Sequence, residues 1–221
     1  MNELPNVEQS YGVELVRKTI HLCSLSIPIV YYFISKSAAL SILIPLLLVF
    51  GLPDLLRLYH APTRRVYNKF FGWLLRKHER DEHARNLNGA TYVLLSACLF
   101  IWFFPKIIFI TAFSVLIVSD TLAALVGRRF GKHPLFKKSL EGTAAFFLSA
   151  LVVIIVAPKA EGTGAEYLIG AAAAFVGAIV EAAFTFIDDN LLIPFSVGVT
   201  MWLLYHFLLP TVNLYVLETV H

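Results

Sequence analysis

Residues 107–142 read IIFITAFSVLIVSDTLAALVGRRFGKHPLFKKSLEG, an apolar run that holds Asp120 near its inner end and continues into glycines and cations. The run can cross ~30 Å of hydrocarbon, for which a helix needs about 20 residues. A carboxylate in such a helix costs roughly 2.5 to 3.5 kcal/mol at mid-bilayer, so an acid there is a candidate functional group. The stretch therefore predicts a membrane-spanning helix that leads into a polar site.

The composition of the whole chain agrees with a membrane location. The 221 residues are 58% hydrophobic and only 15% charged, which is too little polar surface for a soluble globule of this size. We expect an all-α integral membrane protein that forms a single domain over residues 1–221, with about seven transmembrane helices and one interfacial helix. The apolar runs lie at about residues 18–35, 38–56, 89–105, 107–126, 140–157, 168–187 and 191–209.

The distribution of lysine and arginine predicts the topology. Most of these cations fall just before the first apolar run, in the loop 57–88 and in the loop 127–139. By the positive-inside rule, these segments, the N-terminus and the site are cytoplasmic, and the C-terminus lies on the opposite side. The first apolar run does not look like a cleaved secretory signal and should remain attached. Cations set topology in any membrane protein, so their number alone indicates no chemistry.

The stretch TRRVYNKFFGWLLRKHER, residues 63–80, alternates apolar and basic side chains with a helical period. It predicts an amphipathic helix in the cytoplasmic interface. Two interpretations remain open, an anchor to anionic lipid and a gate through which a lipid substrate enters.

Polar residues also follow a helical period in the first predicted helix. Glu14, Arg17, Lys18 and His21 fall at i, i+3, i+4 and i+7, so they share one face where the helix enters the membrane. We expect this face to contact protein or a nucleotide. The alternative is a polar stripe satisfied within itself, with Glu14 paired to Lys18.

The residues around Asp120 predict an anion site. Asp120, Ala124 and Gly127 share a face, so a groove of small residues runs from the acid to the helix end, as is also common in helix packing. The basic loop that follows ends at Ser139, a predicted N-cap whose helix presents exposed amides and a positive dipole end. This suits a triphosphate, although no GxxxxGK[ST] loop occurs in the chain.

A second acidic group lies late in the chain. Glu181 and Asp188 are seven residues apart, so we expect them on one stripe of the sixth helix, ~10 Å apart along its axis, with Asp189 and Asn190 beside the latter. Mg²⁺ that bridges phosphates needs one or two carboxylates. We therefore predict a magnesium site among Asp120, Glu181, Asp188 and Asp189. The alternative for residues 188–190 is a polar turn that ends a helix.

Five segments in this order resemble the CTP-dependent polyprenol and diacylglycerol kinases, a family of integral membrane enzymes that includes dolichol kinase and phytol kinase. The segments are ELVRKTIH (14–21), LNGATY (87–92), DTLAALVGRRFGKH (120–133), KKSLEG (137–142) and EAAFTFIDDNLLIP (181–194). The resemblance implies transfer of the γ-phosphoryl group of CTP to a membrane lipid alcohol, which is a polyprenol, a phytol-like isoprenoid or diacylglycerol. It also implies Mg²⁺ as cofactor and no nucleic-acid partner, and it leaves the acceptor and the oligomeric state open.

The polar residues and glycines of these segments are the candidate site residues. The catalytic candidates are Asp120, Lys138, Glu141 and Asp188. The nucleotide-binding candidates are Arg17, Lys18, His21, Asn88, Thr91, Gly127, Arg128, Arg129, Gly131, Lys132, Ser139, Gly142 and Asn190.

Two other functions remain as alternatives. The chain is also similar to the phosphatidate cytidylyltransferases around Asp120 and residues 138–142, but IDDNLLIP stands where their KD, HGG and DR elements are expected, which favours a kinase over a CDP-lipid synthase. A polytopic transporter would place acids along a path across the membrane, whereas the candidates here gather at the cytoplasmic ends of the helices.

Overall fold

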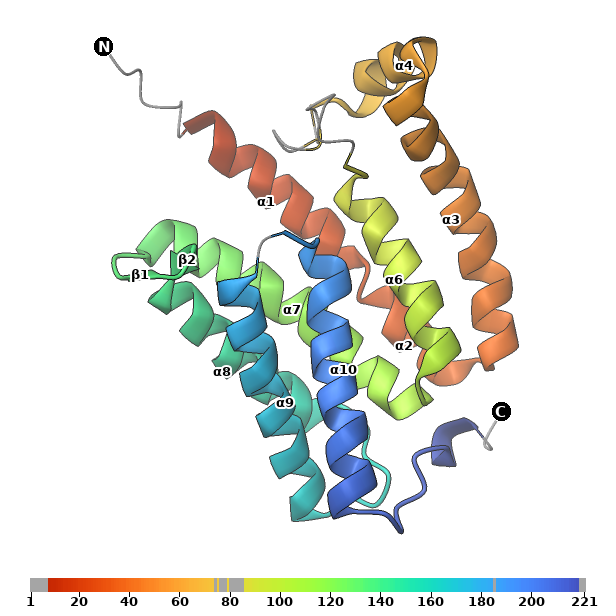
Figure 1. The fold of residues 1–221 in the computed structure, drawn as a ribbon, viewed down its shortest axis with the longest axis vertical. Helices are drawn as coiled ribbons and strands as arrows, with labels where there is room; N and C mark the ends of the chain where they lie inside the picture. The colour runs from red at the N-terminus through yellow and green to blue at the C-terminus, as the bar shows by residue number, and fades with distance from the viewer. Residues whose placement is uncertain (1–7, 74, 76–78, 80–85, 185, 219–221) are drawn as a thin grey trace.

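The computed structural model describes residues 8–73, 75, 79, 86–184 and 186–218, and almost all of its regular structure is helical (Figure 1). The helices are α1 (Glu8–Cys23), α2 (Ser26–Phe33), α3 (Lys36–Tyr59), α4 (Ala61–Phe71), α6 (Gly89–Phe103), α7 (Lys106–Phe130), α8 (Leu140–Val156), α9 (Gly164–Ala183) and α10 (Asp189–Leu208). A two-stranded antiparallel hairpin, β1 (Pro134–Leu135) and β2 (Lys138–Ser139), links α7 to α8, and a short 3₁₀ helix, η1 (Val216–Glu218), follows α10.

The expected all-α class is confirmed, and the count of about seven membrane spans stays a prediction. Among the described residues, four helices are long and apolar enough to cross a membrane, namely α3, α7, α9 and α10, and α6 and α8 are shorter apolar helices. Their outward faces carry many exposed apolar side chains, such as Val49, Val156 and Leu168. A helix that presents such a surface is stable against lipid tails, where it would be unfavourable against water.

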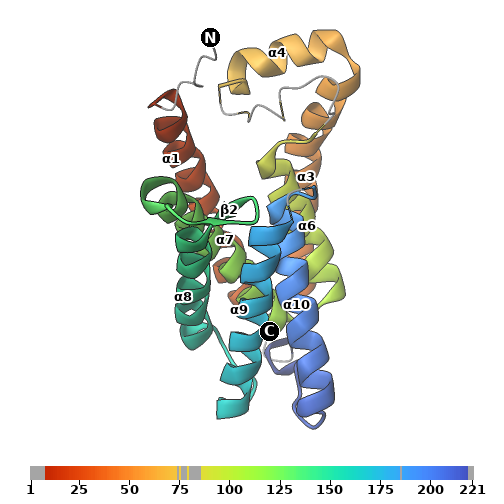
Figure 2. The same cartoon turned by 60° about the vertical axis from the view of Figure 1, so that its left-hand side comes forward.

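Helix α7 forms the centre of the fold. It packs against α8 and α10 along much of its length and against α1 and α2 on another side, while α9 lies between α8 and α10 (Figures 1 and 2). A separate layer is made by α3, which packs against α6 and α4. Of the most apolar part of α7, 78% of the residues are buried, so Asp120 belongs to the most enclosed helix of the bundle.

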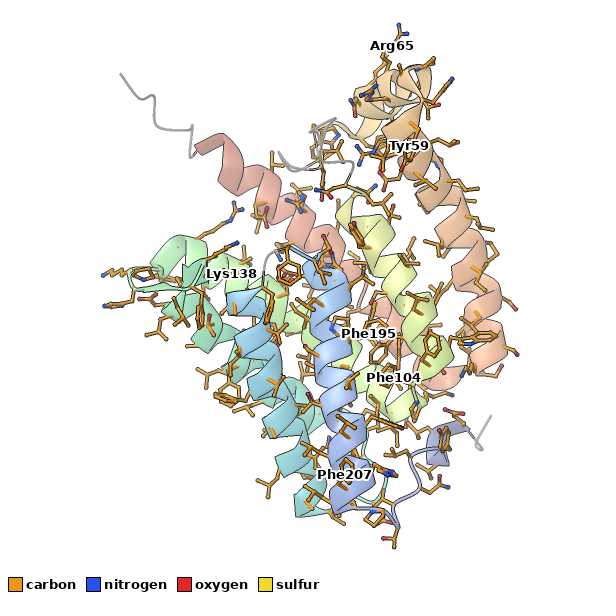
Figure 3. The ribbon with its side chains drawn as sticks, in the orientation of Figure 1. Tyr59, Arg65, Phe104, Lys138, Phe195 and Phe207 are labelled. Atoms are coloured by element: carbon orange, nitrogen blue, oxygen red, sulfur yellow. The ribbon has the colours of Figure 1, made fainter. Side chains whose placement is uncertain are left out.

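Aromatic side chains join the two layers. Phe195 of α10 and Phe104 beside α6 point toward one another, with ring centroids 6.0 Å apart (Figure 3). Phe100 stacks on Phe104 and contacts Phe109 of α7. Phe100 and Phe109 are fully buried, and Phe104 and Phe195 are partly buried against them. Buried aromatic rings contribute much of the packing energy of a core, so α6, α7 and α10 form one unit beneath the polar site.

The first predicted span, residues 18–35, is two helices. Helix α1 ends at Cys23, a turn covers residues 24–25, and α2 begins at Ser26. Pro28 explains the break, because proline has no N–H and its ring clashes with the carbonyl four residues earlier, here that of Ser24. The polar face of α1 is thereby separated from the apolar α2.

The sequence placed Asp188 in the sixth helix, and this prediction is wrong. Helix α9 ends at Ala183, and Asp188 is the N-cap of α10, where its side chain accepts a hydrogen bond from the Asn190 N–H at 3.0 Å. Aspartate is favoured at a helix start and disfavoured inside a helix, because its carboxylate satisfies an otherwise unpaired N–H. The run 188–190 therefore begins a helix, and Glu181 and Asp188 do not share a helical stripe.

The predicted amphipathic helix is present as α4 and ends at Phe71, earlier than residue 80. Much of the rest of that prediction, residues 74, 76–78 and 80, lies outside the described residues. Figure 2 shows α4 extending from the end of α3 toward the side on which α1 lies.

Candidate active site

The polar face of α1 lies against α7 and meets Asp120. The Nζ atom of Lys18 lies 2.5 Å from Oδ2 of Asp120 and 3.2 Å from its backbone oxygen. His21 Nε2 lies 3.7 Å from the same carboxylate oxygen. Lys18 and Asp120 are both buried, so their charges are stabilised mainly by each other. The expectation that this face contacts protein is confirmed.

Glu14 pairs with two arginines and not with Lys18. Its Oε2 atom lies 2.9 Å from Arg17 Nη1 and 3.4 Å from Arg128 Nη2 at the end of α7. The alternative pairing of Glu14 with Lys18 is wrong, because Lys18 points to Asp120 instead. Two ion pairs, Lys18 with Asp120 and Glu14 with Arg128, thus connect α1 to the half of α7 that is predicted to face the cytoplasm.

A second charged cluster surrounds Lys138 of β2, which Figure 3 shows at the same end of the bundle. Its Nζ atom lies 2.6 Å from Glu181 Oε1 of α9 and 3.1 Å from Asp189 Oδ2 of α10. Burial by itself lowers the pKa of Lys138, but the carboxylates of Asp189, Glu181 and Asp120 outweigh it, so the pKa is raised above its usual 10.5. Lys138 is therefore an ammonium ion at neutral pH and connects this cluster electrostatically to Asp120.

Ser139 holds the loop in place. Its side chain accepts a hydrogen bond from Gly142 N at 3.2 Å, which confirms it as the N-cap of α8. Gly127, Gly131 and Gly142 pack around it, and a Cβ added at Gly142 would lie 3.0 Å from the backbone oxygen of Ala123. The three glycines, predicted as nucleotide contacts, therefore allow α7, α8 and the loop to approach closely.

The remaining candidates in the loop lie at its surface. Arg128, Arg129 and Lys132 are exposed, and His133 Nδ1 lies 2.7 Å from Glu141 Oε1. Glu141 also accepts from the His133 backbone N–H, so it fixes the turn that carries the cations. Exposed cations next to a helix start can receive an anion from the water phase.

Helices α1, α3, α4 and α6 enclose a cavity of about 480 Å³ that reaches Asp120. The polar part of the lining includes Lys18, His21, Asp120 and Asn190. The wall is mostly apolar and is formed by side chains that include Ile20, Val49, Phe50, Phe71, Leu75 and Val93. The cavity thus places apolar side chains and the Lys18–Asp120 pair in one lining, and it was not predicted from the sequence.

Three candidates lie where α6 and α10 begin. Asn88 caps α6, because its side chain accepts a hydrogen bond from Thr91 N at 2.8 Å. Asn190 donates to Asp188 Oδ1 at 2.7 Å and to Gly89 O at 3.4 Å, so it joins the two helix starts. Thr91 is buried toward α3 near Gly51 and is not part of the cavity lining.

The sequence missed a buried network beside the cavity. Asp54 is fully buried in α3, and its Oδ1 accepts from Arg57 Nε at 2.6 Å. Arg57 also donates to the backbone oxygens of Glu79 and Asn86 at 2.9 and 3.0 Å, and Asn88 N donates to Asp54 at 2.8 Å. The sequence did contain one signal of this network, since Asp54 stands three residues before Arg57 in an otherwise apolar helix. The network fastens the segment that follows α4 to α3.

The predicted magnesium ligands face different partners. Asp120 pairs with Lys18, Asp188 caps α10, and Glu181 and Asp189 converge on Lys138. Within the described part of the chain, no three His, Cys, Asp or Glu side chains form a group that could hold a metal ion. Glu181 and Asp189 nevertheless direct oxygens at one cation, and Glu181 Oε2 is buried without a hydrogen-bond partner. A Mg²⁺ site that binds a phosphate substrate commonly has only one or two protein carboxylates, with phosphate oxygens and water as its other ligands. Glu181 and Asp189 fit such a site.

The fold and site define an all-α membrane protein in which paired charges, buried at one end of the bundle, adjoin an apolar cavity. Over 190 residues the chain is 30% identical to the uncharacterized protein RP860 of Rickettsia prowazekii (strain Madrid E), which covers 85% of this chain and 93% of that protein. The chain belongs to the same family as RP860.

A second relative has a described activity. The chain is 28% identical over 155 residues to the CTP-dependent diacylglycerol kinase 1 of Schizosaccharomyces pombe, covering 64% of this chain and 69% of the kinase. No protein-family profile and no solved structure match the chain.

Proposed function

We propose that the protein is a CTP-dependent lipid kinase that transfers the γ-phosphoryl group of CTP to a membrane alcohol, either an isoprenoid alcohol or diacylglycerol. The observation that carries the proposal is the position of Asp120. Asp120 and its partner Lys18 both line the mostly apolar cavity. Asp120 also interacts electrostatically with Lys138, which is bonded to carboxylates of α9 and α10. The distant similarity to the S. pombe kinase supports the same reaction.

In this proposal the two substrates approach Asp120 from different sides. The exposed cations Arg128, Arg129 and Lys132 attract the triphosphate, and Lys138 neutralises charge on the transferred group. Phosphoryl transfer requires mainly positioning and charge stabilisation, so a site built from cations and a helix start is sufficient. Glu181 and Asp189 would hold Mg²⁺, which would supply positive charge to offset that of the phosphates.

The lipid hydroxyl approaches through the cavity. Its oxygen attacks the γ-phosphorus, and a new O–P bond forms while the bond to the oxygen that bridges the β- and γ-phosphates breaks. CDP leaves, and the hydroxyl proton passes to Asp120, the lining carboxylate that is bonded to Lys18. Enclosure by apolar side chains excludes water, which would otherwise compete as acceptor.

Labelled CTP tests the reaction directly. Purified protein in detergent with an alcohol acceptor should move label from the γ-phosphate of CTP into the lipid, and chelation of Mg²⁺ should stop the transfer until the ion is restored. Label from the α-phosphate appearing in the lipid, with release of pyrophosphate, would instead identify a CDP-lipid synthase. If isoprenoid alcohols, diacylglycerol and phosphatidate all remain unlabelled, the proposed reaction is wrong.

A further inference from the structure

The cavity has an apolar side that is open at the surface of the bundle. Ile20 of α1 and Val49 and Phe50 of α3 line it, yet these side chains are 48%, 65% and 52% exposed. Helix α3 is one of the helices long and apolar enough to cross a membrane. An opening bounded by such residues faces lipid tails rather than water.

The helices beside this opening are not packed on one another. The main partner of α1 is α7, whereas α3 packs on α6 and α4. Above the opening, α4 is held by Tyr67, whose hydroxyl accepts a hydrogen bond from Asn88 and whose ring lies under the Arg57 guanidinium at 5.1 Å. Phe71, in the last turn of α4, belongs to the cavity lining. A chain can therefore enter between α1 and α3 without separating a packed helix pair.

The charges in the lining favour an uncharged head group. The cations Arg17 and Lys18 are balanced by the carboxylates of Glu79 and Asp120. Lys18 is bonded to Asp120, and Arg17 is bonded to Glu14. A phosphate monoester requires cations that are not already neutralised, because burying an uncompensated dianion is costly. A hydroxyl group needs only hydrogen-bond partners, and the polar side chains of the lining provide them.

We propose that the cavity between α1, α3, α4 and α6 is the binding site for the acceptor lipid, which enters sideways from the bilayer between α1 and α3. Its uncharged hydroxyl end lies at the Lys18–Asp120 pair, and its hydrocarbon chain lies along Ile20, Val49 and Phe50. This assignment rests on the proposed kinase function, and it adds the location, the route of entry and the charge of the acceptor.

Photolabelling of the full-length protein in lipid vesicles tests the location without requiring turnover. The probes are a diazirine-bearing isoprenoid alcohol and a diazirine-bearing diacylglycerol, and mass spectrometry maps the labelled peptides. At least one probe should label the facing parts of α1 and α3, and the same alcohol without the diazirine should compete. Labelling spread evenly over the lipid-facing helices, or confined to α8 and α9, would overturn the assignment.

A bulky substitution at the opening tests the route. Val49→Trp adds volume at an exposed position, so it should leave the fold intact, raise the KM for the alcohol about tenfold and leave the KM for CTP unchanged. Val152→Trp on α8, at a position that is 61% exposed and outside the lining, is the matched control. Equal kinetics of both variants and the unmodified protein would exclude entry at this opening.

Competition by an anionic lipid tests the head group. Phosphatidate should not displace the labelled alcohol from α1 and α3, and displacement as effective as that by the alcohol would overturn the uncharged assignment. Because labelling does not depend on turnover, its outcome is independent of the kinase test. Specific labelling without γ-phosphoryl transfer would contradict the proposed reaction and retain the lipid site, whereas transfer without labelling of α1 and α3 would contradict the site alone.

Discussion

Lys18 of α1 and Asp120 of α7 are 102 positions apart in the chain and are joined by a buried ion pair of 2.5 Å. Both residues line the cavity, and the pair links the N-terminal helix to the centre of the bundle. Removal of either partner leaves an unpaired buried charge, which is far more costly than the loss of an exposed ion pair. The pair is therefore expected to matter both for stability and for chemistry.

The first prediction concerns this coupling. Asp120→Asn and Lys18→Met should each destabilise the protein by about 3 kcal/mol, and the double variant should lose less than the sum, because neither charge is then left alone. Thermal unfolding in detergent provides the measurement, with the exposed Glu161→Gln as control. Phosphoryl transfer should be abolished in Asp120→Asn, and substantial activity there would remove Asp120 from the proposed mechanism. Simple additivity of the two losses would mean that the pair is not energetically coupled.

The second prediction compares adjacent lysines. Lys138→Gln removes the ammonium between Glu181 and Asp189 and should lower the rate of phosphoryl transfer by about a hundredfold, a typical loss for one charge-stabilising group. Lys137→Gln changes an exposed position next to it and should stay within about twofold. The initial rate of γ-label transfer at saturating CTP measures both. Equal rates for the two variants would contradict a role for Lys138.

The third prediction concerns the network that the sequence did not reveal. Arg57→Met leaves the fully buried Asp54 without its main partner and should destabilise the protein by about 3 kcal/mol. Arg65→Met, at an exposed position of α4 labelled in Figure 3, should change stability by less than about 0.5 kcal/mol. The unfolding temperatures of the two variants, measured in the same detergent, test this prediction. If Arg57→Met unfolds at the same temperature as the unmodified protein, the network is dispensable for stability.

The fourth prediction separates packing from ligand contact among the glycines. Gly142→Ala should cost about 1–3 kcal/mol, because the new methyl group would lie 3.0 Å from Ala123 O and 3.2 Å from Gly127 Cα. Gly164→Ala, where nothing lies within 4 Å, is the control and should be neutral or slightly stabilising. If Gly142→Ala keeps full stability and loses only CTP binding, the glycine contacts the nucleotide rather than the neighbouring helix.

The fifth prediction is a pH dependence. Burial, followed by the charge of Asp54, raises the pKa of Tyr67 from 10.0 to about 12. The raised pKa means that the folded protein holds the phenolic proton more tightly than the unfolded chain, so the stabilisation is complete below about pH 10 and is lost as the pH rises toward 12. The difference in unfolding temperature between the unmodified protein and Tyr67→Phe should therefore shrink above about pH 10. A constant difference up to pH 11 would contradict the raised pKa.

Local signals explain what could be predicted. Ser139 was expected as a helix cap because a cap depends on a few adjacent residues, and its side chain forms the expected bond to Gly142 N. The apolar runs predicted most of the helices because burial against lipid requires about 20 apolar residues in a row. Asp188 was misplaced because a polar run can end one helix or begin the next, and the position of the turn after Ala183 decides between them.

Partners distant in the chain could not be predicted in the same way. The spacing of Glu14 and Lys18 permits a pair within α1, yet Lys18 pairs with Asp120 of α7, and Glu14 pairs with Arg17 of α1 and Arg128 of α7. The Arg57 network and the cavity depend on how α3, α4 and α6 are placed around α1. No short-range pattern encodes these distances.

The sequence by itself determined a helical membrane protein with acids and cations at the ends of its helices, because hydrophobic length and helical period are properties of adjacent residues. Only the tertiary structure decided that Lys18 neutralises Asp120, that Lys138 joins Glu181 to Asp189, and that a mostly apolar cavity includes the first of these pairs in its lining. The physical reason is that a buried charge is stable only beside its counter-charge, and the packing of the helices selects which counter-charge is within reach.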